Sequence, residues 1–547
     1  MGKKIALLGS VLLFAVFFFF FVFSSPGDES PGVLEPGSLA GQVRQAEKLL
    51  QNGSQTMDPG EIRLCFRGEE LACDREQKTW YLPVDMDSAD WEAGTFTDAA
   101  DEIQIFPLQD YTLFDKQTAV AEGQQFRLLA WREDGAVCAV IQVVFTGLPV
   151  VRIETDADIS IDTVFAGSIV FYEACGSEQW TRSSVFQAHE RGQTTRAFPK
   201  KGYRVNLITV TSSGVINENP MPVLGMRESD SWIFYAIYSD GTKIRDKFNI
   251  ELWNEFGASN TPYDAHYGTH MEYAELVVNG EYRGLYGILE PVDSDQLQIS
   301  DQEYLYKRTY GRELLPELFD EVEPEEYLTV LGMEIKGKDG AGTKADWKCF
   351  RQFAGMCEAD DRTFTREAES LLYLDNTVDI WIYLQMLYGE DNIYKNMFFA
   401  FKKEASGYRL YLVPWDVDLT WGNVYADTEE DLYTVYEPER AGEYLEWPFA
   451  DRLLSLDTGG IREMVKMRWQ ELRLSTLSDA HMEELMQSCI HLVQDSGAFA
   501  RDAQRWPDSH HDGDYDGMRR FMSERMDFLD NWIQECNNKN IESEQER

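Results

Sequence analysis

The residues best suited to chemistry lie in one stretch, residues 389–423, where acidic and amide side chains border two alternating apolar runs. Asp391 and Asn396 are separated by four residues, and Asp416 directly follows the second run. The alternation predicts a β-hairpin whose flanks bring the three side chains together. Mg²⁺ binds carboxylates together with phosphates and water, and a further carboxylate can accept the proton of an attacking hydroxyl. The pattern therefore predicts a compact oxygen-rich pocket that suits a hard cation such as Mg²⁺.

The end of this stretch and three earlier segments together resemble a known family. In chain order they read ERGQTTRAFPKKGYRVNLI, LGMRESDSWIFYAIYSDGTKIRDKFNIELWNEFG, YAELVVNGEYRGLYGILEPVD and LVPWDVDLTWGN. Over roughly residues 148–535 the chain resembles the CotH family of spore-coat-type atypical protein kinases. The most specific elements are Asn-Gly-Glu-Tyr-x-Gly-x-Tyr and Pro-Trp-Asp-x-Asp, whereas the His-Arg-Asp and Asp-Phe-Gly contexts of ordinary kinases are absent.

The resemblance implies an atypical two-lobed kinase fold that transfers phosphate from ATP, with Mg²⁺ or Mn²⁺, to Ser or Thr of a protein substrate. It implies that Asp391 is the catalytic base and that Asn396 and Asp416 are metal ligands. The resemblance also implies that the protein acts at the cell surface or in a spore coat.

The resemblance also assigns the nucleotide-binding residues. Lys201 is the lysine that holds the phosphates, with Lys200 as its rival, because side chains alternate along a strand and only one lysine can face the cleft. Arg191 begins an Arg-Gly turn that lets the backbone approach the phosphates. A helix expected over 243–256 offers an acid to pair with the lysine. The candidates are Asp246, Glu251 and Glu255.

An apolar run near the N-terminus predicts the topology. Lys3 and Lys4 precede residues 5–23, and nineteen residues rising ~1.5 Å each span about 28 Å, close to the hydrocarbon thickness of a bilayer. We expect an uncleaved single-pass anchor in the cell membrane with the bulk of the chain outside the cytoplasm. The alternative is a cleaved signal peptide and a secreted protein.

The fold class is predicted as α+β, with four segments. Residues 1–25 form the anchor or signal peptide, and the Pro- and Gly-containing residues 26–60 form a linker with one short helical patch. Residues 61–147 read as a small all-β domain of sandwich type. Residues 148–540 form the kinase-like domain, with strands and one helix first and a helix-rich part after them.

The net charge of the chain limits the classes of molecule that it can bind. The chain has 547 residues, with 95 acidic against 50 basic side chains, a formal net charge of −45. Affinity for nucleic acid depends on Lys and Arg, so a nucleic-acid partner is excluded. A protein substrate that is basic and rich in Ser is favoured, because opposite fields steer encounter. The membrane is contacted through the N-terminal helix.

Two other function classes compete with a kinase. The predicted anchor puts the site outside, where ATP is scarce, so the alternative is a non-catalytic surface or cell-wall binding protein that keeps an acidic metal pocket. Nucleotide binding with Mg²⁺ separates these two. A glycoside hydrolase with two carboxylates is the third class, but it leaves the Lys-Lys strand and the spacing of Asp391 and Asn396 unexplained.

Overall fold

The computed structural model of the protein describes most of residues 38–545. Residues 54, 59–60, 86–95, 101, 112–113, 135–136, 161–162, 174–179, 193, 258–268, 311–315, 339 and 426–433 are not described, nor are side chains after residue 535. The predicted membrane anchor, residues 1–25, lies outside the described residues. Among those that are described, no helix is both long and apolar enough to span a bilayer.

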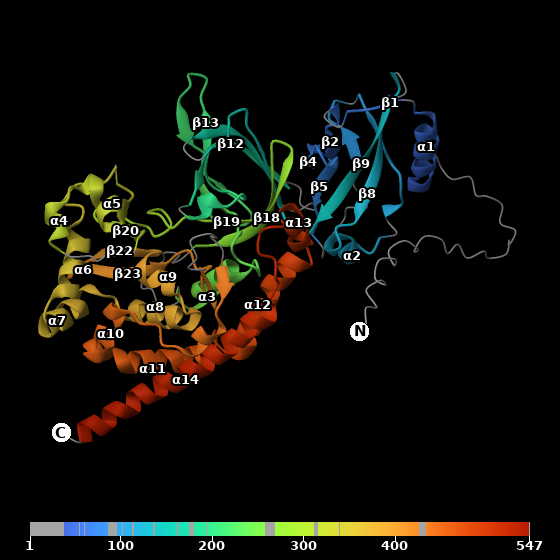
Figure 1. The fold of residues 1–547 in the computed structure, drawn as a ribbon. Coiled ribbons are helices and arrows are strands. Elements are labelled where there is room, and N and C mark those ends of the chain that lie inside the picture. Colours follow the sequence, from blue (N-terminus) through green and yellow to red (C-terminus); the bar gives the residue numbers. More distant parts are fainter. Residues whose placement is uncertain are drawn as a thin grey trace, which may run out of the picture.

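The first domain is a mixed β-sheet covered on both faces (Figure 1). Ala46 of helix α1 (Leu39–Asn52) packs on Trp131, whereas the neighbouring Ala130 belongs to the core on the other face. The large sheet contains β1 (Gln55–Thr56), β4 (Ala72–Asp74), β5 (Thr79–Pro83), β7 (Gln104–Pro107), β8 (Gln125–Arg132) and β9 (Val137–Thr146). The small sheet contains β2 (Leu64–Phe66), β3 (Glu69–Glu70) and β6 (Phe96–Asp98), and helix α2 (Lys116–Ala121) follows them.

The all-β prediction for residues 61–147 needs correction, since this domain includes α1 and α2. Its helical start also lies inside the predicted linker, residues 26–60. The expected helical patch is confirmed, but it is a full helix capped by Ser38 and packed on the sheet. A short amphipathic helix takes most of its stability from such packing, which the local sequence does not reveal.

Seven strands of the next region close into a barrel, because β12 pairs with both β11 and β13. They are β10 (Val150–Glu154), β11 (Phe165–Tyr172), β12 (Thr181–Arg191), β13 (Gly202–Val210), β17 (Ser231–Tyr235), β18 (Met271–Val278) and β19 (Glu281–Leu289). The predicted hairpin turn is confirmed: Asn279 and Gly280 have φ of 51° and 73°, as a type I′ turn requires. The chain between β13 and β17 forms three short strands, β14 (Ile216–Glu218), β15 (Met221–Pro222) and β16 (Glu228–Ser229).

A helix-rich region follows, as predicted. Helix α3 (Arg245–Phe256) precedes a four-stranded sheet in the order β21-β20-β22-β23. Its strands are β20 (Tyr304–Arg308), β21 (Met333–Lys336), β22 (Met397–Glu404) and β23 (Gly407–Pro414), and a separate ribbon pairs β24 (Asn423–Tyr425) with β25 (Thr434–Tyr436). The helices are α4 (Leu318–Glu321), α5 (Tyr327–Leu331), α6 (Lys348–Glu358), α7 (Asp361–Leu371), α8 (Leu374–Leu387), α9 (Glu390–Tyr394), α10 (Pro448–Ser455), α11 (Ile461–Arg473), α12 (Asp479–Gln494), α13 (Ala498–Arg505) and α14 (Tyr515–Gln545).

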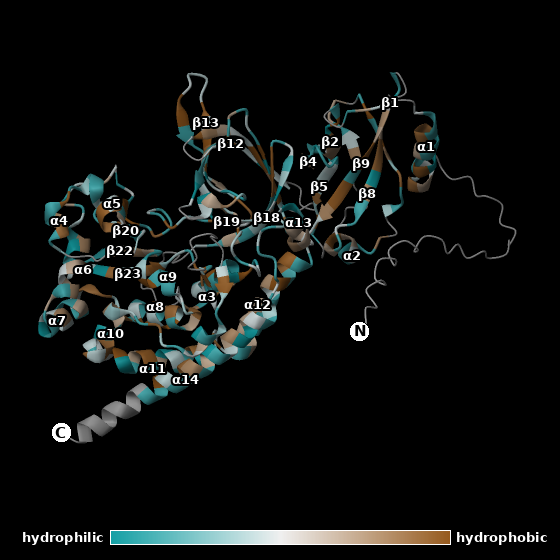
Figure 2. Ribbon diagram, in the orientation of Figure 1, coloured by the Kyte–Doolittle hydropathy of each residue, from teal (hydrophilic) through white to brown (hydrophobic). Residues whose placement is uncertain are grey.

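The architecture is mixed α+β. Figure 2 shows hydrophilic and hydrophobic residues interleaved along α11 and α14, as expected for helices with one buried face. Helices α7 and α8 pack on β23, and α11 and α14 pack on α8, but α13 returns to the barrel and packs on β19 (Figure 1). The barrel and the helix-rich region are therefore joined through the chain after β19, through α13, and through α3, which lies in the chain between β17 and β18 and packs on both β18 and α8.

Candidate active site

A cleft of about 290 Å³ is lined by residues from the barrel and from the end of the β22–β23 hairpin. Four of the five residues assigned from sequence line it. They are Arg191, Asp391, Asn396 and Asp416. The fifth, Lys201, does not. The tertiary structure thus gathers residues from four separate elements around one space.

The end of the hairpin brings Asn396 and Asp416 close together. Met397 pairs with Pro414, and the Trp415 N–H donates to the Asn396 carbonyl at 3.1 Å. Asn396 and Asp416 both have left-handed backbones, with φ of 57° and 58°. That conformation is uncommon outside glycine and concentrates at functional sites, where the surrounding structure imposes it.

Asp391 lies in the first turn of α9 and contacts Asn396 directly. Its Oδ2 accepts a hydrogen bond from Asn396 Nδ2 at 2.6 Å, and its Oδ1 lies 3.1 Å from Lys395 Nζ. Burial raises the pKa of Asp391, and the charge of Lys395 opposes that rise. The carboxylate is consequently oriented and a stronger proton acceptor than a free aspartate.

Asn392, which sequence analysis missed, clamps both sides of the hairpin end. Its Nδ2 donates to the carbonyls of Trp415 at 2.8 Å and Asn396 at 3.2 Å, and the residue is 1% exposed. A buried amide next to Asp391 therefore couples the position of that carboxylate to the position of Asp416. Its place inside the Asp391–Asn396 spacing was the only signal available in the sequence.

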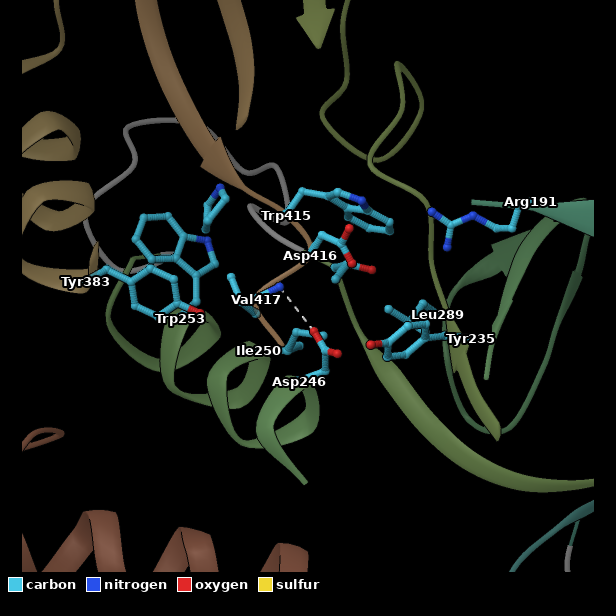
Figure 3. A pocket seen from close by; sticks show the side chains of 12 residues that line it. Arg191, Tyr235, Asp246, Ile250, Trp253, Leu289, Tyr383, Trp415, Asp416 and Val417 are labelled. Carbon is cyan, nitrogen blue, oxygen red and sulfur yellow. Dashed lines mark hydrogen bonds between the residues drawn. The ribbon is translucent and has the colours of Figure 1, made fainter. Parts of the chain in front are cut away.

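Three carboxylates, which we call the acid cluster, gather behind the hairpin end: Asp246, Asp416 and Asp418. Figure 3 shows Asp246 on α3 below Asp416, with its Oδ1 accepting from the Val417 N–H at 3.2 Å. The other oxygen, Asp246 Oδ2, is buried and has no hydrogen-bond partner among the residues that the structure describes. Burial and the charges of Asp418 and Asp416 raise the pKa of Asp246 well above its usual range.

Asp418 is held by two hydroxyl groups. Its Oδ2 accepts from Tyr235 at 3.0 Å and from Ser239 at 3.1 Å. Burial and the charge of Asp416 raise the pKa of Asp418 to about 7, although both hydrogen bonds oppose the shift. The acid cluster thus carries more negative charge than its own neighbours compensate.

Helix α3 positions the loop that carries Asp416. Asn249 Nδ2 donates to the Val417 carbonyl and to Thr420 Oγ1, both at 2.8 Å, and its Oδ1 accepts from Trp421 Nε1 at 2.7 Å. All of these atoms are buried, so the loop is fixed by hydrogen bonds that water cannot replace. This explains how a residue followed by irregular backbone keeps one orientation.

Of the Lys-Lys pair, Lys200 and not Lys201 lines the cleft, but the ammonium groups of both lysines have partners within the chain. Lys200 is 1% exposed, and its Nζ lies 2.7 Å from Asp502 Oδ1 on α13 and 2.5 Å from the Leu285 carbonyl. Lys201 Nζ donates to the Arg196 carbonyl at 2.6 Å. Asp502 also accepts from the Leu285 N–H and from His511. We call Lys200, Asp502 and His511 the paired cluster.

The three candidate acids of α3 pair with neither of these lysines. Glu251 lies 2.9 Å from Lys247, and Glu255 lies 2.5 Å from His481. Asp246 belongs to the acid cluster. The ammonium–carboxylate pair that the resemblance places on this helix is therefore absent among the described residues, because the lysines point toward α13 and the turn before β13.

Arg191 lies at the end of β12, followed by a turn that only glycine can make. Gly192 has φ of 113°, and a Cβ at this position would lie 1.9 Å from Thr195 Oγ1. The Arg191 guanidinium lies over the Trp415 ring, 5.9 Å from its centroid. The barrel thereby contributes to the cleft the guanidinium of Arg191 and, at Gly192, backbone that no side chain covers.

A third lysine, Lys307 on β20, lines the cleft and was not identified from sequence. Burial and the nearby charges of Arg191 and Lys336 lower the pKa of Lys307 to about 8. Lys307 reaches the cleft because β20 pairs with β22, which places Lys307 opposite Phe398. That pairing joins segments about ninety residues apart, which alternation alone cannot predict.

The family follows from a match that spans the site. Residues 188–529, more than half of the chain, match the family described as CotH kinase protein. The chain belongs to the CotH family. None of the curated proteins compared matches it. The CotH match begins within β12 and ends within α14, so it contains every residue of the site, whereas the first domain lies outside it.

The CotH site fits a hard cation by its chemistry. Within the described part of the chain, no group of three or more His, Cys, Asp or Glu side chains is arranged so that it could hold a metal ion by itself. The donor atoms are nevertheless all oxygen atoms, and the buried Asp246 Oδ2 has no hydrogen-bond partner among the described residues. The charge of Asp416 also raises the pKa of Asp246 and of Asp418. A divalent cation would give Asp246 Oδ2 a partner and offset the repulsion between the carboxylates, and phosphate oxygens would complete its shell.

Proposed function

We propose that this CotH protein transfers the γ-phosphoryl group of ATP, with Mg²⁺ or Mn²⁺, to Ser or Thr hydroxyl groups of a protein. The observation that carries the proposal is the joint placement of Asp391, Asn396 and Asp416 at the end of one hairpin, facing the cleft. A base and two metal ligands need this proximity for phosphoryl transfer.

In the proposed reaction Asp391 receives the proton of the substrate hydroxyl. The hydroxyl oxygen attacks the γ-phosphorus, the bond from that phosphorus to the β–γ bridging oxygen breaks, and ADP leaves. Asn396 orients Asp391 through its amide nitrogen, which leaves the amide oxygen as a ligand atom. Asp416 supplies a carboxylate ligand, and a bound Mg²⁺ would neutralise charge on the phosphates.

The barrel contributes to nucleotide binding in this proposal. Arg191 offers a guanidinium to the phosphates, and the turn at Gly192 allows the backbone to approach them. Lys201 was assigned to the phosphates by resemblance. Its bond to the Arg196 carbonyl gives it a further role, which is to hold the segment after Gly192 in place.

We propose a basic, Ser-rich protein substrate and a site outside the cytoplasm. The charge of −45 favours basic acceptors, and the apolar residues 5–23 favour a membrane anchor with Lys3 and Lys4 inside. External protease added to intact cells should degrade the bulk of the chain, and full protection would reverse the proposed orientation.

A second function is favoured by one observation. Lys200 is paired with Asp502, and among the described residues no acid of α3 pairs with Lys200 or Lys201, since Glu251 pairs with Lys247 instead. A CotH protein without catalysis, which uses the acid cluster to hold a cation while binding surface partners, would be compatible with that arrangement.

One experiment separates the two functions. The full-length chain is incubated with γ-labelled ATP and Mg²⁺ or Mn²⁺, together with a basic or an acidic Ser-containing peptide of equal length. We expect label on the basic peptide that depends on the metal and weakens at high salt. Metal binding without any incorporated label would establish the non-catalytic alternative.

A further inference from the structure

Two cations from different parts of the chain converge on one aromatic ring in the cleft. Arg191 comes from the barrel strand β12, and Lys307 comes from β20 in the helix-rich region. The Lys307 ammonium lies 5.6 Å from the centroid of Trp415 and 5.5 Å from that of Phe398, while Arg191 lies 5.9 Å from the same Trp415 ring. The ring attracts each cation modestly, but the two cations repel each other.

Neither cation has an acidic partner among the described residues, which is notable in so acidic a chain. Other lysines around the same sheet are paired: Lys336 with Glu334 at 2.5 Å, and Lys402 with Glu303 at 3.6 Å. Lys307 and Arg191 form no ion pair and no hydrogen bond with the described residues. Partly buried, unpaired like charges are costly, so the arrangement calls for an anion between them.

The anion must satisfy three conditions. It must carry more than one negative charge, reach from the barrel to β20, and lie beside Asp416, whose carboxylate is among the charges acting on Lys307. A polyphosphate chain meets all three, since a cation held by Asp416 would bind its other oxygens. A single carboxylate carries only one negative charge and so fails the first condition.

We propose that Lys307 and Arg191 together form the polyphosphate-binding pair of this site, with Lys307 as the lysine that holds the phosphates. The inference rests on the proposed function for the identity of the ligand as a nucleoside triphosphate. It differs from the assignment to Lys201, whose ammonium is bonded within its own turn. In this protein the phosphate lysine comes from the sheet of the helix-rich region, while the barrel supplies an arginine.

Binding of inorganic tripolyphosphate and of ATP to the full-length chain, by calorimetry with and without Mg²⁺, tests the pair. We expect Lys307→Met to weaken the binding of both ligands by about tenfold or more, because the loss of a hydrogen bond to a charged group has an effect of this size. Arg191→Met should act similarly, and Lys307→Arg should recover most of the affinity. Lys403→Met, an exposed lysine on β22 of the same sheet, is the matched control and should bind as the wild type does.

The outcomes separate the pair from the proposed function. Unchanged affinity in Lys307→Met, or a larger loss in Lys201→Met, would overturn the pair while leaving ATP-dependent transfer intact. Lys307-dependent binding of tripolyphosphate without any phosphoryl transfer would support the pair and overturn the proposed function. Failure of the wild-type chain to bind either ligand would overturn both. Melting curves of each variant show that a lost affinity is not lost folding.

Discussion

The acid cluster and the paired cluster both bury charge, yet their electrostatics are opposite. In the paired cluster, Asp502 accepts hydrogen bonds from Lys200, the Leu285 N–H and His511. These partners outweigh the effect of burial and lower the pKa of Asp502 to about 2. In the acid cluster burial and like charges raise the pKa values of Asp246 and Asp418, and Asp246 Oδ2 has no hydrogen-bond partner in the described part of the chain.

The difference separates structure from function. A buried charge whose partners are all supplied by the chain has no capacity left for a ligand, and it ties α13 to the barrel. Buried carboxylates that the chain leaves uncompensated either bind a proton or are compensated by a bound cation, so they keep the capacity for a ligand. Removing a group should therefore have opposite consequences in the two clusters, which makes the comparison testable.

The largest effect is expected for Asp416→Asn. Asn tolerates the left-handed backbone of this position, so the fold should persist. Phosphoryl transfer should fall by more than about 10⁴-fold because a metal ligand is lost. The melting temperature should stay equal or rise, since one of several repelling charges is removed.

Kinetics and thermal melting of purified Asp416→Asn check both parts, with the exposed Asp361→Asn as the control. A clear drop in melting temperature together with retained activity would place Asp416 among the structural residues.

Asp391→Asn should cost about 10²- to 10⁴-fold in transfer rate, because an amide cannot accept the hydroxyl proton. The side chain can still accept the Asn396 hydrogen bond, so ATP affinity should change little. Single-turnover transfer and nucleotide binding are measured on the same preparation, over a range of salt. Wild-type transfer at any ionic strength would remove Asp391 from the role of base.

In the paired cluster, Asp502→Ala should lower the free energy of unfolding by about 3 kcal/mol, because Lys200 is left buried without its counter-ion. The matched control is Glu281→Ala. Glu281 is the half-exposed partner of Arg505, which lies on α13 like Asp502, and its removal should lower the free energy of unfolding by less than about 1 kcal/mol. Urea denaturation measures both. Similar losses in the two variants would mean that the buried pair is no stronger than the exposed one.

The smallest effect is a pH dependence of that same pair. The pKa of Asp502 in the folded protein, about 2, lies below its ordinary value of 3.8. Its stabilisation is therefore complete above about pH 5 and is lost as the pH falls through 4 toward 2, a change of about 2 kcal/mol. The stability difference between wild type and Asp502→Asn should shrink over this interval in urea titrations. A constant difference would contradict the lowered pKa.

Local patterns were enough to predict much of this protein. The Asn279-Gly280 turn, the helix at residues 245–256 and the hairpin of residues 397–414 follow from alternation, periodicity and turn chemistry, which act over a few residues. The Asn-Gly-Glu-Tyr-x-Gly-x-Tyr and Pro-Trp-Asp-x-Asp elements led to the CotH family. The gathering of Asp391, Asn396 and Asp416 was also predictable, because all three flank one hairpin.

Tertiary structure alone decided which charges meet across long distances in the chain. Lys200 and Asp502 are 302 residues apart, and nothing near either residue indicates the other. Lys307 enters the cleft because β20 pairs with β22, and Asp246, one of three candidate partners for the lysine, instead lies under the Asp416 loop. Side-chain type is a property of the sequence, but pairing and desolvation depend on the neighbours that folding brings together. The sequence therefore determined which residues could do chemistry, and the fold decided which of them were left unpaired to do it.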